Sequence, residues 1–274
     1  VPGLGRSGER GRGRGTDCGN LTATDPSEDR DFWLGWQESW DRQQARALPD
    51  REERFSVLLS LIGALAGDHP PRVLDLACGC GSITSRVLKK FPSSSVVAAD
   101  LDPVLLRIAE GVFQGDDRVR LAEVDLRRDD WAAALPLSEY DAVVSATALH
   151  WLAPERLAAV YASVASLLRV GGLLANADQM PLAESPALDR VVASLSPPPG
   201  RAGEEWHEWW ERVEGTPRFA ALLEERGRRF GGILHPDEFT PSAAWHIENL
   251  TSGGFSEAEV VWRRGGAAVV AALR

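Results

Sequence analysis

From residue 72 onward, short apolar runs alternate with amphipathic segments, which is the pattern expected when strands and helices follow each other in an α/β fold. The runs have the length of strands, and the segments between them carry apolar residues at helical spacing. Parallel strands are expected at 72–77, 95–100, 118–124, 140–147 and 171–178. Helices are expected between them at 82–91, 103–112 and 154–169, and a closing pair of strands at 256–263 and 267–273.

The segments outside this alternation are helical or lack periodicity. Residues 1–30 carry too few apolar groups to offset the entropy of ordering, which predicts a disordered tail. Two helices are expected before the first strand, at 31–47 and 51–66, with Asp50 as the cap of the second. After residue 178 proline punctuates the chain, and further helices are expected at 183–196, 204–213, 216–230 and 241–251.

A turn of small residues separates the first expected strand from its helix. The stretch RVLDLACGCGS, residues 72–82, is an apolar strand that contains one acid, Asp75, and ends in a glycine turn. The N-terminus of the following helix has unpaired N–H groups and partial positive charge, and glycines let a ligand approach the main chain. Asp100 ends the second strand, 21 residues after Gly79, where an acid in a βαβ unit reaches ribose hydroxyls. These features predict a nucleoside-bearing ligand at the carboxyl edge of a parallel sheet.

The glycine spacing decides between two classes of nucleoside ligand. A dinucleotide site requires G-x-G-x-x-G, but the third position is Thr84, which argues against a dehydrogenase. The stretch instead resembles motif I of the class I S-adenosylmethionine-dependent methyltransferases, in which two apolar residues and an acid precede three alternating glycines. Ala77 replaces the first of those glycines, and Cys80 occupies a variable position. The resemblance covers about residues 40–274.

This resemblance implies a Rossmann-like sheet of seven mostly parallel strands in the order 3-2-1-4-5-7-6, with the last strand antiparallel and helices on both faces. After the tail expected from composition (1–30), it implies lid helices with a cofactor-binding core (31–178), a helical substrate cap inserted after the fifth strand (179–252) and the last two strands (253–274). The implied cofactor is S-adenosyl-L-methionine, with S-adenosyl-L-homocysteine as its product. The residues assigned to it are Asp75, Ala77, Cys78, Gly79, Gly81, Asp100, Leu101, Asp125, Leu126, Ser145, Trp40 and Arg54.

Three of these residues have specific expected roles. Asp100 is assigned to the ribose, because its neighbour Asp102 is better explained as the N-cap of helix 103–112. Asp125 is implied to accept a hydrogen bond from the adenine amino group, although an aspartate that ends a strand is also a common turn residue. Arg54 is implied to approach the methionyl carboxylate, and the alternative is an ordinary surface arginine.

The segment after the fourth strand is the best candidate for the reaction itself. In this fold the fourth strand lies beside the first, across the topological switch point, so its end faces the ligand. The run from Asp141 to Leu152 resembles the corresponding motif of small-molecule methyltransferases, including the trans-aconitate methyltransferase-like group. His150 is the candidate catalytic base because histidine titrates near neutrality, or it contacts the substrate without moving a proton. Weaker candidates are His207, His235 and His246.

Tryptophans recur at helical spacing on both sides of the core. One helix face carries Trp33, Trp36 and Trp40, and another carries Trp206, Trp209 and Trp210. The first stripe either packs on the core or, as the resemblance implies, belongs to a lid helix that folds over the cofactor. The second either holds the cap on the core or presents aromatic walls to an organic substrate. The residues assigned to substrate binding are His150, Trp151, Trp36, Trp206 and Trp210.

Composition argues against several other functions. The net charge of −10 disfavours a nucleic-acid or anionic-membrane surface. The sequence has neither an 18-residue apolar run nor the apolar centre of a signal peptide, so a cytoplasmic location without a membrane partner is expected. Cys78 and Cys80 lack a second pair or histidines at zinc spacing, so no metal is expected. Lysine occurs only as Lys89 and Lys90 among 30 basic residues, which suggests a GC-rich bacterial genome.

The leading interpretation is a bacterial enzyme, a monomer or homodimer, that methylates an oxygen, carbon or nitrogen of a small molecule in secondary metabolism. The alternative is a protein that binds the cofactor without catalysis and serves as a regulatory or structural partner. A nucleic-acid methyltransferase ranks lower, because those that modify amino groups usually carry [N/D/S]-P-P-[Y/F/W] after strand 4. The corresponding segment here is Ser145-Ala146-Thr147-Ala148.

Overall fold

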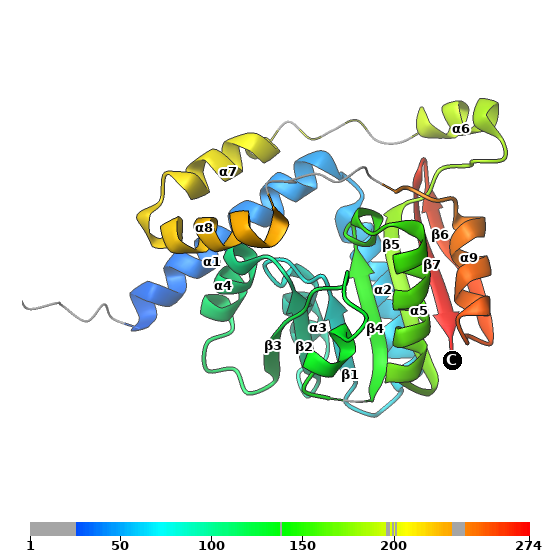
Figure 1. The fold of residues 1–274 in the computed structure, drawn as a ribbon, viewed down its shortest axis with the longest axis horizontal. Coiled ribbons are helices and arrows are strands. Elements are labelled where there is room, and N and C mark those ends of the chain that lie inside the picture. The colour runs from blue at the N-terminus through cyan, green and yellow to red at the C-terminus, as the bar shows by residue number, and fades with distance from the viewer. Residues whose placement is uncertain (1–25, 138, 196–197, 199, 201, 232–238) are drawn as a thin grey trace, which may run out of the picture.

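The computed structural model describes residues 26–274 except 138, 196, 197, 199, 201 and 232–238 (Figure 1). Its helices, 3-10 turns (η) and strands are, in chain order, α1 (Pro26–Ala47), α2 (Arg51–Ala66), β1 (Arg72–Leu76), α3 (Ser82–Lys90), β2 (Ser95–Asp100), α4 (Pro103–Val112), β3 (Val119–Glu123), η1 (Trp131–Ala134), β4 (Tyr140–Ala146), η2 (Leu149–Trp151), α5 (Pro154–Leu167), β5 (Leu168–Gln179), α6 (Pro186–Ala193), α7 (Trp206–Glu214), η3 (Pro217–Phe219), α8 (Ala220–Phe230), α9 (Ala243–Ser252), β6 (Glu257–Arg264) and β7 (Ala267–Leu273).

The seven strands form one sheet in the order β3-β2-β1-β4-β5-β7-β6, which confirms the predicted fold class. Strands β1 to β5 are parallel, and β7 is antiparallel to both of its neighbours. The central strands are continuous apolar runs because helices bury both of their faces. The pairing of β1 with β4 reverses the direction in which strands are added, so the carboxyl ends of β1, β2, β4 and β5 flank the switch point.

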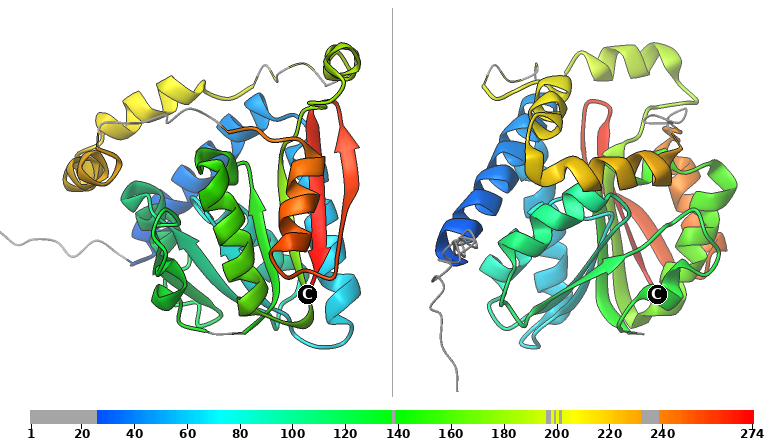
Figure 2. Two further views of the ribbon diagram at one scale, coloured as in Figure 1. Left: turned by 45° about the vertical axis from the view of Figure 1, so that its right-hand side comes forward. Right: turned by 60° about the vertical axis from the view of Figure 1, so that its left-hand side comes forward.

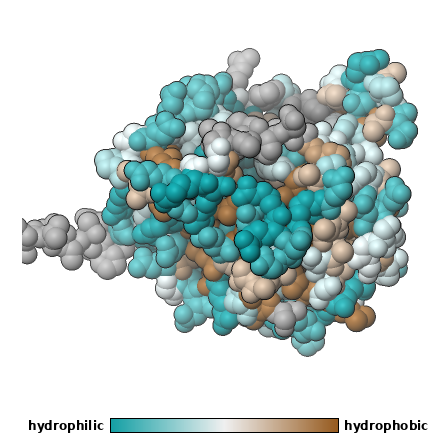
Figure 3. Space-filling view, viewed as in Figure 1, coloured by the Kyte–Doolittle hydropathy of each residue, from teal (hydrophilic) through white to brown (hydrophobic). Residues whose placement is uncertain are grey.

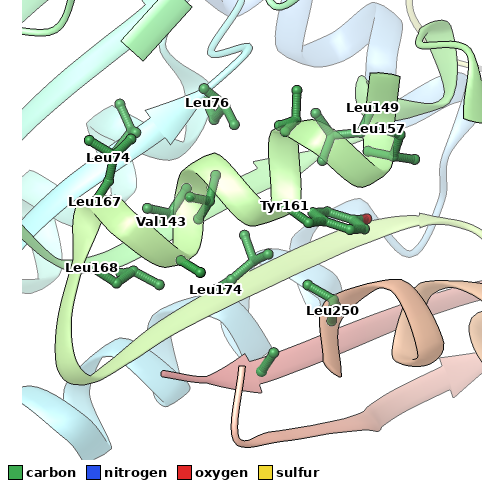
Figure 4. Close-up of a cluster of buried hydrophobic side chains, with 14 of the residues drawn as sticks. Leu74, Leu76, Val143, Leu149, Leu157, Tyr161, Leu167, Leu168, Leu174 and Leu250 are labelled. Carbon is green, nitrogen blue, oxygen red and sulfur yellow. The ribbon is translucent and has the colours of Figure 1, made fainter. Parts of the chain in front are cut away.

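Helices α2 and α3 cover one face of the sheet, and α5 and α9 cover the other (Figures 1 and 2). In the second of these layers, Leu74 and Leu174 from the strands meet Leu157 and Tyr161 from α5 and Leu250 from α9 (Figure 4). Full burial of one such apolar side chain stabilises the fold by about 1.5–3 kcal/mol. These two layers hold the carboxyl edge of the sheet rigidly.

A third layer, made of α1, α7 and α8, lies over that carboxyl edge (Figure 1). Its interior is an aromatic cluster that also includes buried side chains of α4. The cluster consists of Trp33, Trp36, Trp40, Trp209, Trp210, Val213 and Phe219, packed on Cys80, Val104, Leu105, Ile108 and Val112. The two tryptophan stripes seen in the sequence therefore face each other.

Several details differ from the sequence-based expectation, among them the start of β5 at Leu168 and not at 171. Helix α1 begins at Pro26, so residues 26–30 are helical and not part of a disordered tail, while residues 1–25 lie outside the described part of the chain. Helix α9, placed in the predicted cap, packs on α5, β6 and β7 and so belongs to the core. Asp50 makes no capping hydrogen bond, because it pairs with the buried Arg54 at 2.7 Å.

Candidate functional site

The glycine turn after β1 is held by the acid in that strand. Asp75 is fully buried, and its Oδ2 accepts hydrogen bonds from the backbone N–H of Thr84 at 3.0 Å and from the Thr84 hydroxyl at 2.7 Å. Gly81 stands at the N-cap of α3 without a side chain, so Asp75 satisfies a helix N–H from the strand instead. Burial raises the pKa of Asp75 to about 6. Thr84, which breaks the dinucleotide pattern, thus supplies both hydrogen bonds to the buried Asp75 carboxylate oxygen Oδ2.

The turn uses left-handed backbone at three alternating positions. Ala77, Gly79 and Gly81 have φ of +58°, +55° and +79°. A Cβ on Gly81 would lie 2.5 Å from the ring of Phe113, so this position also requires glycine for space. Ala77 is one of two residues other than glycine with positive φ in the described chain, the other being Thr147. The turn therefore carries local strain at Ala77.

We expect Ala77→Gly to raise the free energy of unfolding by about 0.5–1 kcal/mol. An L-residue in the left-handed region costs roughly 1–2 kcal/mol, and glycine removes this strain. The extra freedom of glycine in the unfolded chain lowers stability by about 0.5–1 kcal/mol and so offsets part of the gain. Urea unfolding measures the change. Ala133→Gly in η1, where φ is negative, is the matched control and should lower stability. A loss of stability in Ala77→Gly as well would contradict strain at this position.

Asp100, at the end of β2, organises the opposite side of the turn. Its Oδ2 accepts the Gly79 N–H at 2.7 Å, and its Oδ1 accepts the N–H groups of Leu101 and Asp102 at 2.7 and 2.8 Å. Burial raises the pKa of Asp100 to about 6. Asp102 caps α4 by accepting from the N–H groups of Val104 and Leu105, as predicted. Both oxygens of Asp100 thus hold backbone N–H groups, and its assignment to ribose hydroxyls stays a prediction.

Helix α1 lies directly against the glycine turn. The side chain of Gln37 donates from Nε2 to the Cys80 carbonyl at 2.6 Å, and Ser82 donates to Asp41 at 2.5 Å. A Cβ on Gly79 would lie 3.9 Å from the indole of Trp40, so this tryptophan covers the turn. The sequence pointed to Trp40 but not to Gln37 and Asp41. Their only signal was that they lie on the same face of α1 as Trp40.

The two arginines at the start of α2 have different surroundings. Arg54, the predicted contact for a carboxylate, is 3% exposed, pairs with Asp50 and stacks 6.0 Å from the Trp262 ring. Arg51 instead pairs with Asp41 at 2.9 Å, and burial lowers its pKa. Through Asp41 it is linked to the first residue of α3. Arg51 was missed in the sequence because both positions fall in the same helical turn.

Two arginines, one from the loop after β3 and one from α5, hydrogen-bond the residues that follow β3. Asp125 accepts two hydrogen bonds from the Arg127 side chain, at 2.8 Å each, and one from the Arg127 backbone N–H at 3.0 Å, and this pairing lowers the pKa of Asp125. The Leu126 carbonyl accepts a hydrogen bond from Arg156 of α5. Both residues lie at the carboxyl edge, and their assignment to adenine stays a prediction.

A histidine–carboxylate pair lies at the ends of β4 and β5. His150, in η2, has its Nδ1 2.8 Å from Asp178 Oδ1, and Asp178 is buried at the end of β5. Register brings these ends together, because Ala146 of β4 pairs with Ala177 of β5. The ring of Trp151 lies 4.7 Å from that of His150. The backbone between the end of β4 and η2 is strained, since Thr147, a β-branched residue, has φ of +53°.

Further polar side chains continue along β5 from Asp178. Tyr161 and His246, which come from α5 and α9, are hydrogen-bonded at 2.7 Å between Oη and Nδ1. Burial raises the pKa of Tyr161 and lowers that of His246 to about 4, so His246 is neutral at pH 7. Ser145 pairs in register with Asn176, and within the described residues Ser145 Oγ, Asn176 Oδ1 and His246 Nε2 have no hydrogen-bond partner. Buried polar groups of β4 and β5 are thus concentrated beside the His150–Asp178 pair.

The tryptophans assigned to the substrate pack against one another. Trp36 and Trp40 each contact Trp209 edge-on, with ring centroids 5.5 and 5.0 Å apart. Trp206 lies 5.5 Å from Trp40 and is 38% exposed, and Trp210 is buried. These contacts hold α7 on α1, and a role in substrate binding stays a prediction for Trp36, Trp206 and Trp210.

Other candidates can be placed briefly. Burial raises the pKa of Cys78 and Cys80, so both thiols are protonated at pH 7. The described residues contain no cluster of three His, Cys, Asp or Glu side chains that could hold a metal ion. His207 is exposed beside Glu205, and His235 lies outside the described residues. Among the described helices, none is both long enough and apolar enough to cross a bilayer.

Comparison with known proteins agrees with this geometry. Residues 73–172, from β1 to the start of β5, match the family model described as a methyltransferase domain. The chain contains a class I S-adenosylmethionine-dependent methyltransferase domain. The matched segment includes the glycine turn, Asp100, Asp125 and His150.

Several proteins are similar to this methyltransferase domain and its flanking helices. Malonyl-[acyl-carrier protein] O-methyltransferase of Paenibacillus sp. (strain JDR-2) is 29% identical over 68% of this chain and 70% of its own. Trans-aconitate 2-methyltransferase of Streptomyces avermitilis is 33% identical over 42% of each chain. The CurJ carbon methyltransferase structure shares the fold, with a TM-score of 0.55 and 18% identity, over 91% of this chain and 61% of that one. The last two matches span less than two thirds of the proteins compared.

Proposed function

We propose that this protein transfers the methyl group of S-adenosyl-L-methionine to an oxygen of a small organic molecule, and that His150 is the general base. The observation that carries the proposal is the His150–Asp178 pair at the switch point of the sheet. A carboxylate that accepts Nδ1–H favours the tautomer with its lone pair on Nε2, which is the form that removes a proton from a hydroxyl. Asp178 would then stabilise the imidazolium that forms.

The residues of the glycine turn fit the cofactor. Gly79 leaves room beside Trp40, and the N-terminus of α3 suits the carboxylate end of an amino-acid ligand. Asp100, which ends β2 and accepts from the Gly79 N–H, would accept from the ribose hydroxyls. When bound, the sulfonium supplies an electrophilic methyl group and a good leaving group. The protein supplies alignment and exclusion of water, worth up to about 7–11 kcal/mol in ideal cases.

The names of the curated relatives favour a second acceptor class, a carboxylate. Malonyl and trans-aconitate groups both carry carboxylates. In this protein Arg263 shares a cross-sheet row with Asp178, since both pair with Ala268, and its Nη1 donates to the Met180 carbonyl at 2.8 Å. A carboxylate is ionised at neutral pH and needs no base, so His150 would then only orient the acceptor.

Thermal unfolding with S-adenosylmethionine, S-adenosylhomocysteine, NAD and NADP in parallel tests the cofactor. A ligand at about 100 times its Kd stabilises the folded state by roughly 2.7 kcal/mol, so we expect both S-adenosyl compounds to raise Tm by several degrees. NAD and NADP should leave it unchanged because Thr84 replaces the third glycine. A rise with a dinucleotide alone would contradict the proposal.

A further inference from the structure

Helix α8 of the cap is tied to the turn between β2 and α4 by two arginines. Arg226 Nε donates to Asp102 Oδ2 at 2.6 Å, and both side chains are largely buried, with 16% and 7% exposed. Arg229 Nη1 donates to the Leu101 carbonyl at 3.0 Å, and its Nη2 pairs with Glu123 at the end of β3 at 2.9 Å. One helix thus contacts the ends of two neighbouring strands.

These contacts reach the residues assigned to the cofactor. The N–H groups of Leu101 and Asp102 are the two donors to Asp100 Oδ1, so Arg226 and Arg229 hold the same two residues from the other side. At the next strand, Arg127 pairs with Asp125 and donates to the Arg229 carbonyl at 3.2 Å. The turns assigned to ribose and adenine are therefore both fastened to α8.

Arg226 also connects this contact to the rest of the cap. Its guanidinium lies 4.0 Å from the centroid of the Trp210 ring, so it stands between an indole of α7 and the carboxylate of Asp102. Hydrophilic side chains cover α8 on the face of the molecule shown in Figure 3. The contacts of α8 with the β2–α4 turn and with Glu123 come from arginines, whereas Leu222 and Leu223 of the same helix pack on the aromatic cluster.

We propose that Arg226 and Arg229 are positioning residues for the adenosyl half of the cofactor, acting through the β2–α4 turn. The proposal rests on the proposed function, because it presumes that Asp100 binds the ribose of S-adenosylmethionine. The two arginines set the orientation of Leu101 and Asp102 and hence of the Asp100 carboxylate. The cap, which is expected to serve the acceptor, would thus also carry part of the affinity for the cofactor.

Calorimetric titration of S-adenosylhomocysteine into the full chain tests this. We expect Arg226→Gln and Arg229→Gln each to weaken binding by about tenfold, which corresponds to about 1.4 kcal/mol. The matched control is Arg228→Gln, on the same helix, because Arg228 is 67% exposed and pairs with Glu225 of its own helix. In turnover assays KM for S-adenosylmethionine should rise while kcat at saturation stays within about twofold, a split that general loss of packing would not produce.

Salt gives a second measurement that needs no substitution in the core. Binding by the unmodified protein should weaken at high salt, because the Arg229–Glu123 pair has an exposed carboxylate and is screened, whereas the buried Arg226–Asp102 pair is screened much less. The Arg229→Gln variant should therefore lose most of that dependence. Glu123→Gln, at a 59% exposed side chain, is the mild variant if the arginine variants do not fold, and it should weaken binding by a few-fold. If the unmodified protein binds S-adenosylhomocysteine and these variants bind as Arg228→Gln does, the positioning role is wrong. If the unmodified protein does not bind it, the proposed function itself fails.

Discussion

Asp100→Ala should weaken the binding of S-adenosylhomocysteine by about 10²–10⁴-fold. A charge-assisted hydrogen bond contributes roughly 1.5–3 kcal/mol, and the carboxylate is expected to accept from two ribose hydroxyls. The substitution also leaves the N–H groups of Gly79, Leu101 and Asp102 without their acceptor, so the turn itself loosens. Isothermal titration calorimetry measures the affinity, and unchanged binding would contradict the site assignment.

The acidity of Asp100 provides a second measurement on the same group. Its pKa is raised to about 6, so lowering the pH through 6 protonates it and removes an acceptor. Affinity for S-adenosylhomocysteine should therefore fall between pH 7 and pH 5 in the unmodified protein. Asp100→Asn should lose most of this pH dependence, and what remains would report Asp75, whose pKa is also about 6. Asp130→Ala, at an exposed residue paired with Arg128, is the control for a lost surface charge.

His150→Ala should lower kcat by about 10²–10⁴-fold while leaving the affinity for S-adenosylhomocysteine within about threefold. That range is what a positioned general base contributes. His150 pairs with Asp178 at the end of β5, whereas Asp75 and Asp100 accept hydrogen bonds from Thr84 and Gly79. Asp178→Asn should lower kcat by a similar order, because an amide neither fixes the same tautomer nor stabilises an imidazolium. Single-turnover methyl transfer and calorimetry together separate the two effects.

The control for this pair is His207→Ala, because His207 is exposed on α7 and paired only loosely with Glu205 at 3.9 Å. An unchanged kcat in His150→Ala with a raised KM for the acceptor would instead favour the carboxylate class. In that case Arg263→Gln should raise the acceptor KM further. A fall in cofactor affinity alone would refute the placement of His150 beside the reacting atoms.

Local sequence patterns predicted the core closely because its elements are specified locally. The bounds of α2, β2, α4 and β7 match the expected ranges, since each has its own start or stop signal: Pro103 after a capping Asp102, for example, begins α4. The strand order followed from the resemblance, and the structure confirms it. The glycine turn was recognisable because its residues are contiguous.

Contacts between distant segments could not be predicted in the same way. Asp178 lies 28 residues from His150, and Arg229 lies 128 residues from Leu101, so no local spacing connects them. The pairing of Arg51 with Asp41 depends on the packing of α2 against α1, which local spacing does not show. The early start of α1 was missed because the composition around Pro26 is that of a loop. Packing, and not propensity, decided each of these cases.

The aromatic contact between α1 and α7 joins the expected lid helix and the expected cap helix into one packed unit. Trp209 is fully buried between Trp36 and Trp40, and its indole N–H donates to Ser39 at 3.0 Å. Separating the two helices would expose several indoles to water at once. Because α1 also packs on α4 and holds the glycine turn through Gln37, the cap helix α7 is fastened to the core by way of α1.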